Sequence, residues 1–90
     1  PCSGEINSKV ASTESASRLV EYVEAQYADG VRDYTDGLSV AYLDWRFNLR
    51  KSNTEPVIRL NVEVAGDKKL LQEKTDELLQ MIRSEQHEDI

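Results

Sequence analysis

Two stretches in which apolar and polar residues strictly alternate constrain the fold more than any other feature of the sequence. They cover residues 45–50 and 58–64, and their apolar positions are Trp45, Phe47, Leu49, Ile58, Leu60, Val62 and Val64. Successive side chains of a strand point to opposite faces of a sheet, so this spacing predicts two strands, each with one buried and one polar face. A second layer must cover the apolar face.

Three further strands and two helices are predicted around this pair. Residues 5–10 alternate in the same way, and the strand-like runs 31–35 and 38–42 flank Asp36-Gly37. This dipeptide favours a type I′ hairpin turn, in which both central residues take positive φ. Ser12 or Thr13 caps the first helix, and Asp67 caps the second. The inner faces of the two helices are predicted to consist of Ala16, Leu19, Val20, Val23 and Tyr27, and of Leu70, Leu71, Leu78, Met81 and Ile82.

The resulting β-α-β4-α order predicts a two-layer α+β domain. Two helices are expected to cover one face of a four-stranded, mainly antiparallel sheet. The 90 residues suffice for one small domain and not for two, so residues 1–90 are expected to fold around a single core. Residues 1–3 and 84–90 are expected to fray.

Composition excludes several classes of function. The chain has 17 acidic residues against 11 lysines and arginines, and the net charge of −6 argues against a nucleic-acid partner. No apolar run approaches the ~20 residues of a membrane span, so no membrane partner is expected. With one cysteine, Cys2, and one histidine, His87, the chain offers no internal disulfide and no ordinary zinc site.

One segment departs from the acidic average. Residues 46–59 contain four basic residues and one acid, so they carry +3 while the other 76 residues carry −9. Such a local positive site suits a small anionic ligand better than a polyanion. A sheet face with ion pairs would explain the same charges, because structural ion-pair networks are common.

Within this segment, Arg50, Ser52, Asn53 and Thr54 are candidates for a phosphate site at a break between two strands. Arg50 supplies a planar fork of donors, and Ser52 and Thr54 supply hydroxyls. Asn53 adds an amide and tolerates left-handed backbone angles, which would turn consecutive N–H groups inward as an anion nest. A polar turn is the alternative explanation. Neither hydroxyl has a histidine nearby to act as a base, so no catalytic residue is expected in this chain.

The same segment resembles a known protein family. The run DWRFNLRKSNTEP at residues 44–56, followed by RLNVE at 59–63, strongly resembles the C-terminal domain of bacterial phosphomannomutases, in the α-D-phosphohexomutase superfamily. GEIN at residues 4–7 and DGLS at 36–39 also fit that domain, so the resemblance covers nearly the whole chain. Lys51 departs from the small residue or proline expected at its position and makes the local field more basic.

The resemblance implies a TATA-binding-protein-like domain that holds the substrate phosphate not being transferred, with Arg50, Ser52, Asn53 and Thr54 as its ligands. It further implies a four-domain cytoplasmic isomerase that interconverts mannose 1-phosphate and mannose 6-phosphate, in which this domain is a mobile lid. The phosphoserine, the Mg²⁺ loop and the sugar loop of such an enzyme would lie in its other domains, so this chain alone would bind no metal and would be inactive. Its expected partners are a phosphosugar, of mannose or glucose, and the other domains of its own chain. A non-catalytic protein-interaction module of the same fold is the alternative.

Overall fold

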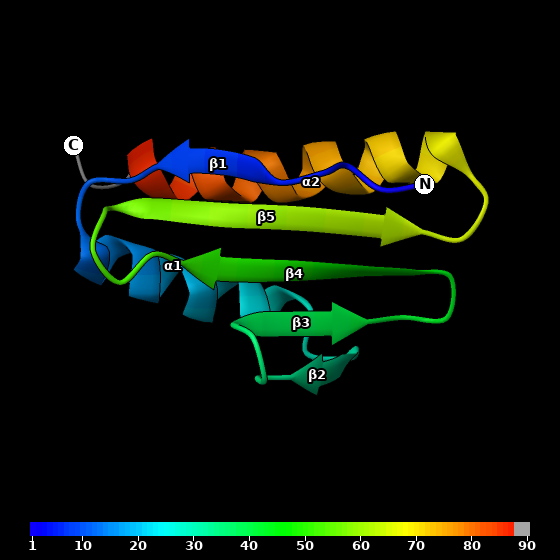
Figure 1. Cartoon of the computed structure of the whole chain (residues 1–90), viewed down its shortest axis with the longest axis horizontal. Helices are drawn as coiled ribbons and strands as arrows, with labels where there is room; N and C mark the ends of the chain where they lie inside the picture. The colour runs from blue at the N-terminus through cyan, green and yellow to red at the C-terminus, as the bar shows by residue number, and fades with distance from the viewer. Residues whose placement is uncertain (88–90) are drawn as a thin grey trace.

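The computed structural model describes residues 1–87, within which seven elements follow one another (Figure 1). They are β1 (Ile6–Lys9), α1 (Thr13–Gln26), β2 (Val31–Asp33), β3 (Leu38–Ala41), β4 (Trp45–Lys51), β5 (Val57–Val64) and α2 (Lys68–His87). The predicted β-α-β4-α order is confirmed. The three short strands are one or two residues shorter than expected.

The five strands found in residues 1–87 belong to one antiparallel sheet with the order β1-β5-β4-β3-β2. The expected four-stranded sheet is therefore wrong, because all five predicted strands belong to the sheet. Strand β1 joins one edge beside β5, with Ile6 opposite Leu60, and β2 forms the other edge. An edge strand needs a neighbour on one side only, so even the three residues of β2 suffice to extend the sheet.

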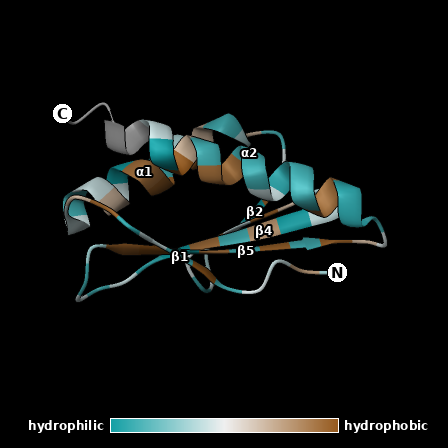
Figure 2. Ribbon diagram, turned by 90° about the horizontal axis from the view of Figure 1, so that it is seen from above, coloured by the Kyte–Doolittle hydropathy of each residue, from teal (hydrophilic) through white to brown (hydrophobic). Residues whose placement is uncertain are grey.

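Both helices lie against the same face of the sheet and leave the other face open (Figure 2). The main contacts join α1 to β4 and α2 to β5. The apolar sides of these elements form one core, whose largest fully buried side chains include Phe47, Leu49, Leu60, Leu78 and Ile82. The alternation in β4 and β5 thus places their polar residues on the open face, where a ligand can reach them.

The predicted helix caps are present. Ser12 Oγ accepts a hydrogen bond from Ser15 N (3.0 Å), and Asp67 Oδ1 accepts one from Lys69 N (2.9 Å). These side chains satisfy amides that have no partner within the first helical turn. The predicted inner faces are buried except for four residues that are only partly covered, namely Val20, Leu70, Leu71 and Met81. Leu79, which was not predicted, is also partly covered.

The connection between β2 and β3 is longer than the predicted hairpin turn. The last pair of the two strands joins Asp33 to Ser39, so five residues lie between them. Gly37 has a φ of +73°, but no residue other than glycine has a positive φ in residues 1–87, which excludes a type I′ turn at Asp36-Gly37. Asp33 Oδ1 accepts a hydrogen bond from Thr35 N (2.7 Å), and this local contact bends the chain earlier than a two-residue turn would.

The two ends of the described chain lie beside β5 and in α2, and the expectation that residues 1–3 and 84–90 fray stays a prediction. Ser3 N donates to Val62 O (2.8 Å) and Val64 N donates to Pro1 O (3.0 Å), so the first residues run alongside β5. At the other end α2 continues to His87, and residues 88–90 lie outside the described part. Within residues 1–87, no helix combines the length and the apolar character needed to cross a membrane.

An aromatic cluster fills the core beneath the start of β4. Tyr27 contacts Tyr42, Trp45 and Phe47 edge-on, with ring centroids 5.1–6.3 Å apart. Its hydroxyl donates to Glu77 Oε1 (2.5 Å). Burial, together with this contact, raises the pKa of the Tyr27 phenol above its usual range. The cluster thereby ties both helices to β4.

Candidate anion-binding site

An open hollow of about 550 Å³ lies where β4 ends and the chain turns toward β5. Its lining consists of Asp36, Gly37, Arg50, Lys51, Ser52, Asn53, Thr54 and Arg59. The four residues predicted to bind phosphate therefore line one site, together with a lysine and a second arginine. The β2–β3 loop reaches the same site because β3 pairs with β4.

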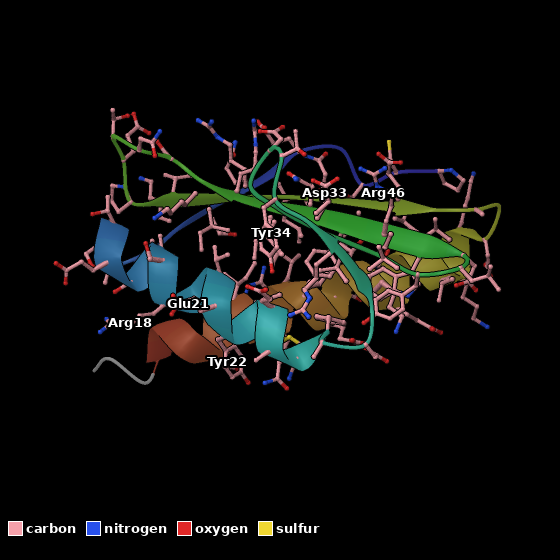
Figure 3. All side chains as sticks on the ribbon, turned by 90° about the horizontal axis from the view of Figure 1, so that it is seen from below. Arg18, Glu21, Tyr22, Asp33, Tyr34 and Arg46 are labelled. Carbon is pink, nitrogen blue, oxygen red and sulfur yellow. The ribbon has the colours of Figure 1, made fainter. Side chains whose placement is uncertain are left out.

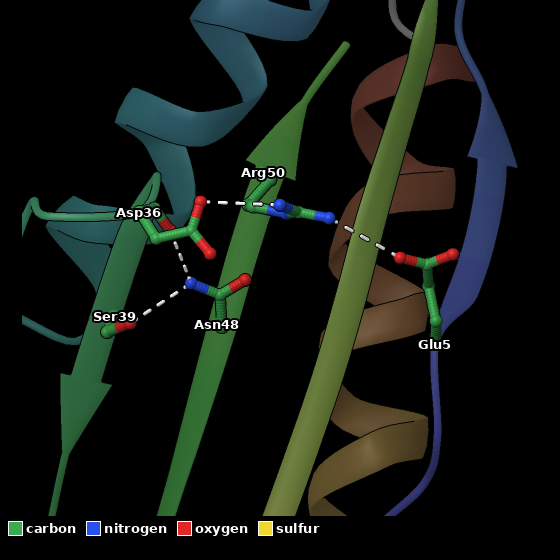
Figure 4. A network of polar contacts seen from close by, with 5 residues as sticks. All are labelled: Glu5, Asp36, Ser39, Asn48 and Arg50. Atoms are coloured by element: carbon green, nitrogen blue, oxygen red, sulfur yellow. Dashed lines mark hydrogen bonds and ion pairs between the residues drawn. The ribbon is translucent and has the colours of Figure 1, made fainter.

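Arg50 lies on the open face of β4, where the alternation of the strand places it. Its Nη1 donates to Asp36 Oδ1 (3.3 Å) and its Nη2 donates to Glu5 Oε1 (3.5 Å) (Figure 4). Glu5 directly precedes β1, and β5 lies between β1 and β4. The guanidinium therefore reaches across β5 on the outside of the sheet, and its side chain is 35 % exposed.

The β2–β3 loop is fixed against β4 at this site. Asn48 Nδ2 donates to the backbone oxygen of Asp36 (2.7 Å) and to Ser39 Oγ (3.0 Å). Gly37 lies directly on Arg50, because a Cβ placed on this glycine would be 2.6 Å from Arg50 Cγ and 2.9 Å from the backbone oxygen of Leu49. The close approach and the positive φ of +73° both require glycine here.

Ser52 organises the β4–β5 loop through its own hydroxyl. Ser52 Oγ accepts hydrogen bonds from Thr54 N (3.3 Å) and Glu55 N (3.2 Å), and it lies 3.5 Å from Thr54 Oγ1. These two amides therefore face Ser52 inside the turn. Since no residue other than glycine has a positive φ in residues 1–87, Asn53 is not left-handed, and the predicted anion nest is wrong. The amides of Ser52, Thr54 and Glu55 are thus engaged within the loop.

Arg59 lines the hollow although it was not among the predicted ligands. It lies directly opposite Arg50 in the β4–β5 ladder, on the same open face. Like charges directly opposite one another destabilise an antiparallel pair. Arg59 Nε is buried without a hydrogen-bond partner, and no carboxylate among the described side chains forms an ion pair with this arginine. An anion held between the two guanidiniums would relieve this repulsion.

Lys51 adds positive charge but is oriented differently. As the strand neighbour of Arg50 it lies toward the helices, and its Nζ donates to Ser17 Oγ of α1 (2.6 Å). On the open face, the guanidiniums of Arg50 and Arg59 therefore lie near the exposed carboxylates of Glu5 and Asp36, while the Lys51 ammonium adds positive charge from the helix side. Three basic groups gathered on a domain of net charge −6 suit a small anion.

The chemistry available in the hollow is binding and charge neutralisation. The hydrogen bonds of Ser52 and Thr54 are to each other and to the backbone, so neither hydroxyl contacts a base among the described side chains. Within the same part of the chain, no group of three or more histidine, cysteine or acidic residues is arranged to hold a metal ion.

Comparison with known proteins identifies the family. The family model described as phosphoglucomutase/phosphomannomutase, C-terminal domain, matches residues 5–81, which include every residue of the hollow. The chain belongs to this family. The resemblance seen in the motifs of the sequence is thereby confirmed.

Curated relatives agree with the family match. A phosphomannomutase of Salmonella montevideo is 55% identical over 84 residues, which are 93% of this chain and 18% of the relative. Phosphohexose mutases of Xanthomonas campestris pv. campestris (strain B100) are 52% identical over 85 residues, 92% of this chain and 18% of the relative. A phosphomannomutase of Escherichia coli (strain K12) is 52% identical over 82 residues, 91% of this chain and 18% of the relative. The chain spans about a fifth of the length of these relatives.

Proposed function

We propose that this chain binds the phosphate group that is not being transferred, as the C-terminal domain of a phosphomannomutase that interconverts mannose 1-phosphate and mannose 6-phosphate. The observation that carries the proposal is that Arg50, Ser52, Asn53 and Thr54 line one hollow, which also contains Arg59. Planar guanidinium groups match the geometry and the charge of a phosphate monoester. The family of the chain supports a phosphosugar as the ligand.

The contribution of the domain to catalysis is positioning and charge neutralisation, which dominate phosphoryl transfer. Arg50 and Arg59 neutralise the phosphate, while the hydroxyls of Ser52 and Thr54 donate to its oxygens. The lining offers donors to a phosphate and few apolar contacts to a sugar ring. The same hollow therefore accepts the phosphate from either end of a bisphosphorylated intermediate.

The remaining chemistry lies in other parts of the enzyme. The phosphoserine, the sugar loop and the Mg²⁺ site belong to other domains, and the described residues of this chain group no ligands suited to a metal. The domain acts as a mobile lid that closes on the bound phosphosugar and excludes water. The chain alone is inactive.

The open hollow binds weakly without the rest of the enzyme. Each hydrogen bond to a charged group contributes roughly 1.5–3 kcal/mol. Association costs several kcal/mol, and the uncovered site stays hydrated. We therefore expect a dissociation constant in the millimolar range, which corresponds to about −4 kcal/mol.

A titration of the isotope-labelled chain with mannose 1-phosphate tests the site. We expect the amides of residues 50–54 and the Arg59 side chain to shift first in the NMR spectrum, with a millimolar midpoint. Shifts confined to other surfaces would show that the hollow is not the phosphate site. A surface that ignores phosphosugars and responds only to a protein would favour the interaction module instead.

A chimaeric enzyme tests the catalytic role. The C-terminal domain of the Salmonella montevideo relative is replaced by this chain, to which it is 55% identical, and mutase activity is measured. Arg50→Ala is expected to abolish most of the activity of an active chimaera. Arg46→Ala is the matched control, because Arg46 lies on the same open face, near Asp33, but opposite Glu63 and outside the hollow (Figure 3). Equal losses in the two variants would contradict a specific role for Arg50.

A further inference from the structure

Arg50, one of the two arginines that line the hollow, is already engaged by two carboxylates. Arg50 Nη1 donates to Asp36 and Nη2 donates to Glu5, so each terminal nitrogen faces an acidic side chain (Figure 4). A phosphate group that binds the guanidinium end-on, through Nη1 and Nη2, meets both carboxylates at these nitrogens. The carboxylates therefore compete with an end-on ligand for the terminal nitrogens of Arg50.

Both contacts have the features of ion pairs that water or another anion displaces easily. Their lengths of 3.3 Å and 3.5 Å exceed the ~2.8 Å of a tight charge-assisted bond. Asp36 is 73% exposed and Glu5 is 46% exposed, so water can replace either contact. Exposed pairs of this kind contribute little to stability, and their main effect here is on the charge that an incoming anion meets.

The placement of the two acids allows them to leave without disturbing the site. Asp36 is held by its backbone oxygen, which accepts from Asn48 Nδ2 (2.7 Å), and its carboxylate is not part of that contact. Glu5 approaches from the opposite edge of the sheet, beside β5. Each carboxylate can therefore swing away from Arg50 while the backbone around the hollow stays in place.

We infer that Asp36 and Glu5 are internal competitors of the phosphate for Arg50. In the empty site they hold the guanidinium across the sheet and neutralise it. A dianionic phosphate displaces them and then remains repelled by their charges, so the two acids lower the affinity and speed the release of the ligand. This inference rests on the proposed function, because a site that must release an intermediate and bind it again by its other end gains from rapid exchange.

The test measures inorganic phosphate binding to the 90-residue chain and to its Asp36→Asn and Glu5→Gln variants. Asparagine and glutamine keep the shape of the side chain and remove only its charge. We expect each variant to bind phosphate about threefold more tightly at low salt, as expected for removal of one exposed charge, and the double variant more tightly still. The affinity of the variants should also fall more steeply with added salt.

Two controls isolate the contact with Arg50. Glu73→Gln removes the same charge from an exposed position on α2, outside the hollow, and should leave the affinity unchanged. Asp36→Glu retains the competing charge and should bind phosphate like the original chain. Thermal unfolding without phosphate establishes that each variant is folded before its affinity is compared.

The outcomes separate this inference from the proposed function. Tighter binding by the Asp36 and Glu5 variants supports competition, whereas unchanged or weaker binding means that the acids merely position Arg50 and overturns it. If the original chain binds phosphate at residues 50–54 and the variants gain nothing, the proposed function stands and the inference fails. If no chain responds to phosphate around Arg50, both are wrong.

Discussion

Replacing Arg59 should make the domain more stable and less able to bind phosphate. Arg59 and Arg50 lie directly opposite each other on the open face, and Arg59 Nε is buried without a partner. A like-charge cross-strand pair costs about 0.2–1 kcal/mol. Arg59→Gln removes this repulsion and the desolvated Nε at the expense of some packing by its stem. We expect a net gain of about 0.5–1 kcal/mol, or roughly 2–8 °C in Tm for a domain of this size.

Phosphate should reverse the order of stability. With a dissociation constant near 1 mM, about 20 mM phosphate stabilises the original chain by about 1.8 kcal/mol, or roughly 7–14 °C. Loss of one charged hydrogen bond of roughly 1.5 kcal/mol or more weakens binding at least about tenfold. The same phosphate concentration then stabilises Arg59→Gln by less than about 0.6 kcal/mol. Thermal unfolding at matched ionic strength, with and without phosphate, measures both effects.

Arg46→Gln is the matched control for this experiment. It makes the same change on the same face, but Arg46 lies opposite Glu63, so its loss should lower Tm slightly and leave the phosphate response intact. The reasoning is refuted if Arg59→Gln lowers Tm in the absence of phosphate, or if it retains the full phosphate shift. Either result would mean that the two arginines do not form a strained, anion-binding pair.

Substitutions at three further positions probe the site and the core. Gly37→Ala should cost about 1–2 kcal/mol in urea unfolding and weaken phosphate binding, because its methyl group meets the stem of Arg50 and its φ is +73°. Ser52→Ala should weaken phosphate binding and cost about 1 kcal/mol, because two loop amides lose their acceptor, whereas Ser52→Thr should retain most of both. The raised pKa of Tyr27 means that the folded state holds the phenolic proton more tightly than the unfolded state does. The free energy of unfolding is therefore retained below pH 10 and falls as the pH rises above it, because the unfolded chain ionises there. Tyr27→Phe should weaken this alkaline loss and cost about 1 kcal/mol at neutral pH through the lost bond to Glu77, as measured by urea unfolding across pH.

The sequence predicts the strands and helices well where periodicity carries the signal. The alternation at residues 45–50 and 58–64 corresponds to β4 and β5, and the capping roles of Ser12 and Asp67 follow from local chemistry. The expectation of a four-stranded sheet fails because periodicity does not reveal which of the five predicted strands join the sheet at its edges. The type I′ turn fails because the Asp33 side chain bonds to Thr35 N, a local competitor that the dipeptide signal ignores.

The site likewise combines residues that are close together in the sequence with one residue that only strand pairing brings near. Arg50, Ser52, Asn53 and Thr54 are contiguous enough to be read from one segment, and the structure brings them together. The role of Arg59 depends on the register between β4 and β5. A shift of this register by two residues keeps the same side chains buried, so the alternating pattern alone does not determine it. Antiparallel pairing that continues from the β4–β5 loop places residue 59 opposite residue 50. The length of the loop is therefore the sequence feature that indicates Arg59.

The position of the single tryptophan determines what fluorescence can report about phosphate binding and unfolding. Trp45 begins β4, stacks on Tyr42 with ring centroids 5.0 Å apart, and has Lys74 Nζ 4.9 Å from its ring centroid. Arg50 lies five residues further along the strand, which at about 3.3 Å per residue is about 16 Å away. Indole fluorescence therefore reports on melting of the aromatic cluster, and a phosphate ion at Arg50 is too distant to quench it by contact. A change in emission on adding phosphate would be the optical signature of a rearrangement transmitted along β4, and unchanged emission would indicate that no such rearrangement reaches the aromatic cluster.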